Sequence, residues 1–174
     1  MDILLKGLNI PMLNYSPLIS MSEAQFQHFL QGAIRDYADQ NIASGRWAED
    51  QAMALSVAEH QRLLPDGVTS KDQHLFVIQD PESELVVGHL WLAVQENLGL
   101  RQGYVYAVEI DHAFRRQGHA RRAFLALESV GKALGLSSIG LHVFAFNLAA
   151  QALYKSLGYR VTGLNMRKNL LGEA

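Results

Sequence analysis

The chain contains no cysteine, and this absence removes several classes of chemistry. Disulfide bridges, thiolate nucleophiles and cysteine-based zinc sites are all excluded. The histidines other than His142 show no spacing typical of a ligand set, so we expect no metal site. The lack of cysteine is compatible with a reducing compartment such as the cytoplasm.

The sequence also lacks an apolar run of the ~18 residues that a transmembrane helix needs. Its first residues, Met1 to Lys6, show no basic start followed by the long apolar core of a signal peptide. The formal net charge is only −2, which indicates no global attraction to nucleic acid or to an anionic membrane. We therefore expect a soluble, cytoplasmic protein that binds neither.

The composition is that of an ordinary globular protein, with 49% hydrophobic and 18% charged residues in a chain of 174. This length suits one domain with a sizeable core. No internal repeat, low-complexity tract or linker interrupts the sequence. We therefore predict a single domain over residues 1–174.

The first third of the chain predicts a short strand and two helices. Residues 8–19 fit a strand at a sheet edge, where their prolines are tolerated. Ser22-Glu23-Ala24-Gln25 fits a capping box, and the helix behind it should end near Ser44-Gly45. A second helix is expected over residues 49–64, before the terminating Pro65-Asp66-Gly67.

The remainder alternates between strand-like and helical patterns. The expected elements are strands at residues 75–78, 85–94 and 103–110, a helix at 120–134, a strand at 138–144, a helix at 147–157 and a last strand or hairpin at 159–170. Short connections between the first three of these strands favour an antiparallel meander. The whole order predicts an α/β (α+β) fold, with a mixed, mostly antiparallel central sheet and helices on both faces.

The most informative motif is the turn Arg115-Arg116-Gln117-Gly118-His119-Ala120, between a predicted strand and a predicted helix. Such a turn directs unpaired backbone N–H groups and the positive end of the helix dipole toward one point, where phosphates bind. Flanking arginines can grip the outer phosphate oxygens. The turn is not a Walker loop or a dinucleotide fingerprint, because neither Gly-Lys-Ser/Thr nor G-x-G-x-x-G is present.

A second motif begins about 27 residues later, with Asn147, Ala150, Leu153-Tyr154 and Gly158-Tyr159 in fixed spacing. With the turn, it resembles the signature of the GNAT superfamily of acyl-CoA-dependent N-acyltransferases. That signature is a Gln/Arg-x-x-Gly-x-Gly/Ala turn followed by an Asn-x-x-Ala-x-x-Leu-Tyr-x-x-x-Gly-Phe/Tyr helix. The resemblance runs from about residue 8 to the end of the chain. It implies the GNAT fold, with the N-terminal strand and acceptor-side helices in residues 8–64 and the acyl-CoA-binding core in residues 74–170.

The resemblance implies roles for two segments around the glycine turn. The turn from Arg115 to Ala120 would hold the coenzyme A pyrophosphate, mostly through backbone N–H groups, and Ala120 replaces a more common glycine. Val108, Glu109 and Ile110 would pair with the pantetheine arm like an extra strand. Because this strand usually splays from its neighbour, a free N–H there would polarise the thioester carbonyl.

The resemblance also implies roles for Asn147 and Tyr154. The asparagine would contact the pantetheine arm, and the tyrosine hydroxyl would protonate the leaving thiolate. Helical spacing places both on nearly one face, apart from a core-facing stripe of Ala150, Leu153 and Leu157. A phenol with a pKa of ~10 can donate to a thiolate whose thiol has a pKa of ~8.5.

The reaction needs a neutral amine, whereas a lysine-like amine with a pKa of ~10.4 is mostly protonated at neutral pH. Glu109 and His142, each acting through water, are the favoured bases, and Tyr106 is a third option. The aromatic residues Trp47, Trp91, Tyr104 and Phe144 could either line the acceptor pocket or simply pack. The residues leave this choice open.

We predict an N-acetyltransferase that uses acetyl-CoA as co-substrate and requires no metal. Its acceptor would be a primary amine of a small molecule or peptide, attacking directly within a ternary complex, since no cysteine can carry the acyl group. The first alternative is a non-catalytic acyl-CoA-binding sensor or interaction module on the same fold. A weaker one is a nucleic-acid-binding domain that uses the arginines. A homodimer is common in the family and would be in keeping with this chain.

Overall fold

The structure, a computed structural model, describes residues 17–168 and 170. Its elements are β1 (Leu18–Ser20), α1 (Glu23–Ala43), α2 (Glu49–Leu63), β2 (Gln73–Gln79), β3 (Val86–Asn97), β4 (Leu100–Ile110), α3 (His119–Ala133), β5 (Ser138–Leu141) and α4 (Leu148–Ser156), with 3-10 turns at Gly67–Thr69 and His112–Phe114. No helix among the described residues is both long and apolar enough to traverse a bilayer.

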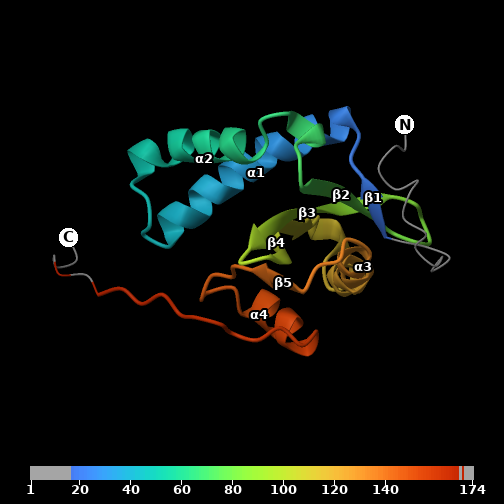
Figure 1. Cartoon of the computed structure of the whole chain (residues 1–174). Helices are drawn as coiled ribbons and strands as arrows, with labels where there is room; N and C mark the ends of the chain where they lie inside the picture. Colours follow the sequence, from blue (N-terminus) through green and yellow to red (C-terminus); the bar gives the residue numbers. More distant parts are fainter. Residues whose placement is uncertain (1–16, 169, 171–174) are drawn as a thin grey trace.

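The strands form one sheet in the order β1-β2-β3-β4-β5. The first four strands pair antiparallel, and β5 pairs with β4 in parallel. Helices α1 and α2 cover one face of the sheet, and α3 and α4 cover the other (Figure 1). The predicted meander, the mixed sheet and the helices on both faces are confirmed.

The predicted helix boundaries are also confirmed, because the capping residues act locally. The Ser22 hydroxyl accepts from the Gln25 N–H, and the Gln25 side chain accepts from the Ser22 N–H, which completes the capping box of α1. Gly45 has a φ of 65°, a conformation that follows helix ends readily when the residue is glycine.

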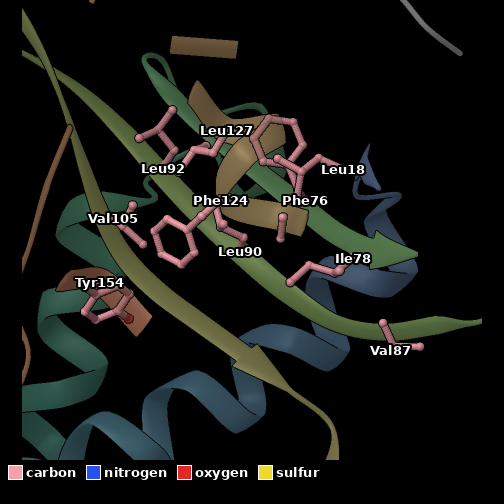
Figure 2. Close-up of a cluster of buried hydrophobic side chains, with 11 residues drawn as sticks. Leu18, Phe76, Ile78, Val87, Leu90, Leu92, Val105, Phe124, Leu127 and Tyr154 are labelled. Atoms are coloured by element: carbon pink, nitrogen blue, oxygen red, sulfur yellow. The ribbon is translucent and has the colours of Figure 1, made fainter. Parts of the chain in front are cut away.

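Each face of the sheet has its own hydrophobic cluster. Figure 2 shows the cluster beneath α3, where Phe124 and Leu127 pack on the sheet and Tyr154 of α4 lies beside Phe124 and Val105. On the opposite face, Phe26 and Phe29 of α1 pack against the sheet. Because both faces are packed, β4 is held firmly between the two helical layers.

Two strand predictions need correction. The strand predicted at 138–144 ends at Leu141, because its pairing with β4 stops at the pair Val105↔Leu141. The strand or hairpin predicted at 159–170 is wrong, since residues 159–168 have no regular secondary structure. This segment runs from α4 toward the connection between α1 and α2, where Arg167 donates to the Gly45 carbonyl (Figure 1).

The physical reason lies in the sheet edge. An alternating pattern becomes a strand only where an edge offers backbone partners, and β5 is only four residues long. Val161, Leu164 and Met166 consequently remain exposed. At the other end of the sheet, β1 confirms the predicted edge strand over Leu18–Ser20, while residues 8–16 lie outside the described part of the chain.

Candidate active site

A β-bulge in β4 sets the direction of the side chains along this strand. Trp91 pairs with Ala107 but Leu92 pairs with Val105, so Tyr106 is the extra residue. Tyr106 and Ala107 both pack with the cluster under α1, instead of alternating between the two faces.

Beyond the bulge the alternation resumes. Val108 and Ile110 pack with the cluster under α3, so Glu109, between them, points to the face covered by α1 and α2. The sequence alternation correctly separated Glu109 from its two neighbours, but the bulge itself left no signal in the sequence.

The second half of β4 has one open edge. Its pairing with β5 ends at Val105↔Leu141, whereas β4 continues to Ile110. A cavity of about 920 Å³ lies along this edge. It is lined by β4 from Val105 to Ile110, by residues 141–144 at and after the end of β5, and by parts of α1, α2, α3 and α4.

The glycine turn lies at one end of the cavity. Arg116 and Gly118 have φ values of 65° and 84°, which bend the chain sharply before α3 begins at His119. The backbone N–H groups of residues 116–121 donate no hydrogen bond within the described part of the chain. Six free N–H groups at a helix N-terminus make a strong site for an anion such as phosphate.

The side chains of the turn have divided roles. Arg115, Arg116 and Arg121 line the cavity. Gln117 instead donates to the Ala113 carbonyl at 3.1 Å and does not line the cavity. The predicted phosphate-binding segment therefore contributes two cationic side chains, Arg115 and Arg116, and a row of N–H groups, and Arg121 in the first turn of α3 adds a third cation.

His119 is buried, and its ring supports the turn. Because arginine can only donate, the Nδ1 atom of His119 accepts from Arg122 Nη2 at 2.9 Å. Asp80, in the turn between β2 and β3, lies 3.8 Å from the same nitrogen. Arg122 also donates to the Gln117 carbonyl at 3.2 Å, so its guanidinium links α3 to the glycine turn.

Glu109 and Arg115 form an ion pair inside the cavity, with 3.2 Å between Oε1 and Nη2. Arg115 Nε also donates to the Ile110 carbonyl at 2.8 Å. Burial raises the pKa of Glu109, the negative charge of Asp36 raises it further, and Arg115 opposes both effects. A carboxyl with a raised pKa is a better proton acceptor than an ordinary exposed one.

The other two base candidates also line the cavity. His142 follows the last residue of β5, and its pKa is lowered by burial and then by the charge of Arg46. The imidazole is therefore neutral at neutral pH, as a base requires. Burial raises the pKa of Tyr106, whose hydroxyl accepts from Gln95 Nε2 at 3.3 Å.

Asn147 has the predicted capping role at the start of α4. Its Oδ1 accepts from the Ala150 N–H at 3.1 Å. The Nδ2 group has no hydrogen-bond partner among the described residues and lies on a side chain that lines the cavity. One side chain can therefore cap the helix and still offer a donor to a ligand.

Tyr154 requires a correction, because the sequence placed it apart from the core-facing stripe of α4. Its ring is buried, with centroids 5.2 Å from Phe124 and 5.8 Å from Tyr159. The residue also lines the cavity, and burial raises the pKa of its hydroxyl. A tyrosine can do both, because its ring packs as an apolar group while its polar tip reaches another surface.

Several cavity residues were missed in the sequence, namely Asp36, Tyr37, Gln40 and Glu59. They lie on α1 and α2, and only the packing of these helices on β4 brings them to the site. The spacing of Ala33, Tyr37 and Gln40 along one stripe of α1 was the signal available. Among the aromatic candidates, Trp91 and Phe144 line the cavity, whereas Trp47 packs on Tyr37 and Tyr104 packs on Tyr106.

Comparison with known proteins agrees with this geometry. The model of the acetyltransferase (GNAT) family matches residues 37–159. YdgE of Bacillus subtilis, named as an N-acetyltransferase, is 33% identical over 88% of this chain and 97% of its own length. The crystal structure of YycN, also from Bacillus subtilis, superposes with a TM-score of 0.83 at 29% identity, over 89% of this chain and 98% of that one.

The family model spans β4, the glycine turn and the Asn147–Tyr154 helix, and the similarity to YdgE extends over nearly the whole of both proteins. The chain therefore belongs to the GNAT family of acetyltransferases and is an acyltransferase enzyme.

Proposed function

We propose that the enzyme transfers the acetyl group of acetyl-CoA to a primary amine by direct attack within a ternary complex. One observation carries the proposal. A single cavity runs from the free N–H groups of residues 116–121, along the open edge of β4, to Tyr154 and Glu109. A phosphate site, an edge for an extended chain and two proton-transfer groups therefore share one space.

The donor would bind through the turn and the strand edge. Backbone N–H groups of residues 116–121, with Arg115 and Arg116, would hold the pyrophosphate. The edge at Val108–Ile110, which pairs with no strand beyond β3, would receive the pantetheine arm in the manner of an added strand. Asn147 would contribute its free Nδ2 group to the same arm.

The chemistry requires two proton transfers around one substitution. The amine nitrogen attacks the thioester carbonyl carbon, the C–S bond breaks, and a free N–H on the β4 edge stabilises the oxyanion. Tyr154 gives its proton to the leaving thiolate; its raised pKa keeps the hydroxyl protonated until then. Glu109 or His142, through water, accepts the proton that the amine loses.

Tyr154→Phe tests the acid role. We expect the variant to lower kcat by about 100-fold, a usual effect of losing a general acid, with little change in the KM for acetyl-CoA. A kcat equal to that of the natural enzyme, measured by release of free coenzyme A, would remove Tyr154 from this role.

Gly118→Glu tests the phosphate site, because a side chain and a negative charge would occupy the turn. Gly99→Glu is the matched control, since Gly99 also has a positive φ, 77°, but lies in open space between β3 and β4. We expect calorimetry to show loss of coenzyme A binding in Gly118→Glu and retention in Gly99→Glu. Equal binding by both would defeat the site assignment.

The homodimer, the cytoplasmic location and the single-domain organisation remain predictions from the sequence. The non-catalytic alternative is not favoured, because the chain belongs to a family of acetyltransferases.

A further inference from the structure

The charged side chains that line the cavity are separated by sign, with the positive ones at the start of α3 and the negative ones on α1, α2 and β4. All the arginines, Arg115, Arg116 and Arg121, come from the glycine turn and the first turn of α3. The carboxylates come from elsewhere: Asp36 on α1, Glu59 on α2 and Glu109 on β4. A site for a polyanionic donor thus adjoins a surface that carries negative charge.

Asp36 is the carboxylate of these three that no described residue neutralises. It forms no ion pair or hydrogen bond within the described residues. Its charge nevertheless acts on Glu109, because Asp36 is the largest cause after burial of the raised pKa of that residue. Two carboxylates that repel each other in a partly buried cavity favour a cation between or beside them.

Glu59 contributes less, because it is already neutralised. Arg62 contacts both of its carboxylate oxygens, at 2.6 and 3.0 Å. The uncompensated negative charge of the cavity therefore rests on Asp36, and also on Glu109 once Arg115 holds phosphate instead. The partner of Glu109 is Arg115, the same residue that would hold phosphate when the donor binds.

Aromatic rings complete the surface on the α1–α2 side. The ring centroids of Trp91 and Tyr106 are 4.8 Å apart, and those of Tyr37 and His60 are 5.8 Å apart. Burial lowers the pKa of His60, so this ring is neutral and adds no positive charge. Aromatic faces beside carboxylates are the usual environment for an ammonium group.

We infer that the acceptor is a small amine with a second cationic group, such as a linear diamine or polyamine, whose distal ammonium is held by Asp36 and the ring of Tyr37. This inference rests on the proposed function, because it assigns the substrate class of the same cavity. The reacting amine must lose its charge to attack, whereas the distal one keeps its charge. Asp36 on α1 would hold the distal charge while Glu109 lies on the β4 edge beside the reacting group.

The test compares a linear α,ω-diamine with the n-alkylamine of the same carbon number, using the full chain and saturating acetyl-CoA. We expect the diamine to have the higher kcat/KM in the natural enzyme. Asp36→Asn should lower the ratio of the two kcat/KM values by about fivefold, the effect of one partly exposed charge pair. Asp39→Asn, on the same helix but outside the cavity lining, should keep the ratio.

Equal kcat/KM values for the diamine and the monoamine would overturn the inference and leave the proposed function intact. An equal fall in the diamine-to-monoamine ratio of kcat/KM in Asp36→Asn and Asp39→Asn would also overturn the inference and leave the proposed function intact. If acetyl-CoA binds but no amine is acetylated, the proposed function fails. In that case calorimetric binding of the diamine, weaker in Asp36→Asn than in Asp39→Asn, would still support the cationic site, and equal binding would refute it.

Discussion

Arg115 of the glycine turn is bound to Glu109 of β4, with 3.2 Å between Nη2 and Oε1. This pair joins the proposed phosphate end of the cavity to the strand beside the proposed acceptor site. A change at one end should therefore be measurable at the other.

The first prediction concerns the pH dependence of Arg115→Ala. Arg115 holds the pKa of Glu109 down against burial and Asp36, so its removal should raise that pKa further. If Glu109 is the base, activity requires its ionised form, and the acidic limb of the kcat profile at saturating acetyl-CoA should move to higher pH.

The control for this profile is Arg101→Ala, which removes a positive charge at the opposite end of β4. Its acidic limb should coincide with that of the natural enzyme. In Glu109→Gln the limb should disappear. A limb that stays fixed in Arg115→Ala would show that Glu109 does not govern it.

The second prediction concerns acid stability and His89. Burial lowers the pKa of His89 to about 4, so the folded protein binds its proton less readily than the unfolded chain does. The unfolded histidine, with a pKa of ~6.5, takes up a proton first as the pH falls. The contribution of neutral His89 to the free energy of unfolding is therefore complete above about pH 6.5. It decreases as the pH falls below that value and levels off near pH 4.

From these pKa values, His89 should account for about 2 kcal/mol of the loss in unfolding free energy between about pH 7 and pH 5. Urea denaturation of His89→Gln should show a smaller loss than the natural protein by that amount. Parallel curves for the natural protein and His89→Gln would refute the assignment.

The third prediction concerns the close approach of two strands at Gly88. A Cβ there would lie 2.1 Å from the Glu109 carbonyl oxygen, which is backbone and cannot turn aside. Gly88→Ala should therefore push β3 from β4, cost at least about 2 kcal/mol of unfolding free energy and reduce activity. Gly140→Ala, where the nearest atom is 3.8 Å away, is the control and should change neither greatly.

The fourth prediction separates the two uses of Asn147. Asn147→Asp keeps the oxygen that accepts from Ala150 but loses the Nδ2 donor, so it should raise the KM for acetyl-CoA without lowering the Tm. Asn147→Ala loses the cap as well and should cost about 1 kcal/mol of stability. An unchanged KM in Asn147→Asp would limit the residue to its capping role.

The features predicted correctly are those that neighbouring residues determine. The capping box at Ser22, the glycine that ends α1 and the turn before α3 all depend on residues within a few positions of one another. The antiparallel meander followed from the short connections between its strands.

The features that were wrong or missed depend on distant partners. Residues 159–168 have a strand-like pattern but no sufficient edge, and the strand at 138 ends where β4 offers no further pairing. Asp36 reaches the cavity only because α1 lies across β4. No pattern within α1 could show which residue on the sheet it would face.

The position of β4, with one open edge and one face covered by α1 and α2, has a consequence for how such an enzyme could evolve. The open edge of β4 offers main-chain groups, which persist whatever side chains the strand carries. The face under α1 and α2 offers side chains, each of which a single substitution alters. Substitutions on those helices should therefore change which amine the enzyme accepts without changing its acyl donor. Helices α1 and α2 are consequently the elements to randomise in directed evolution.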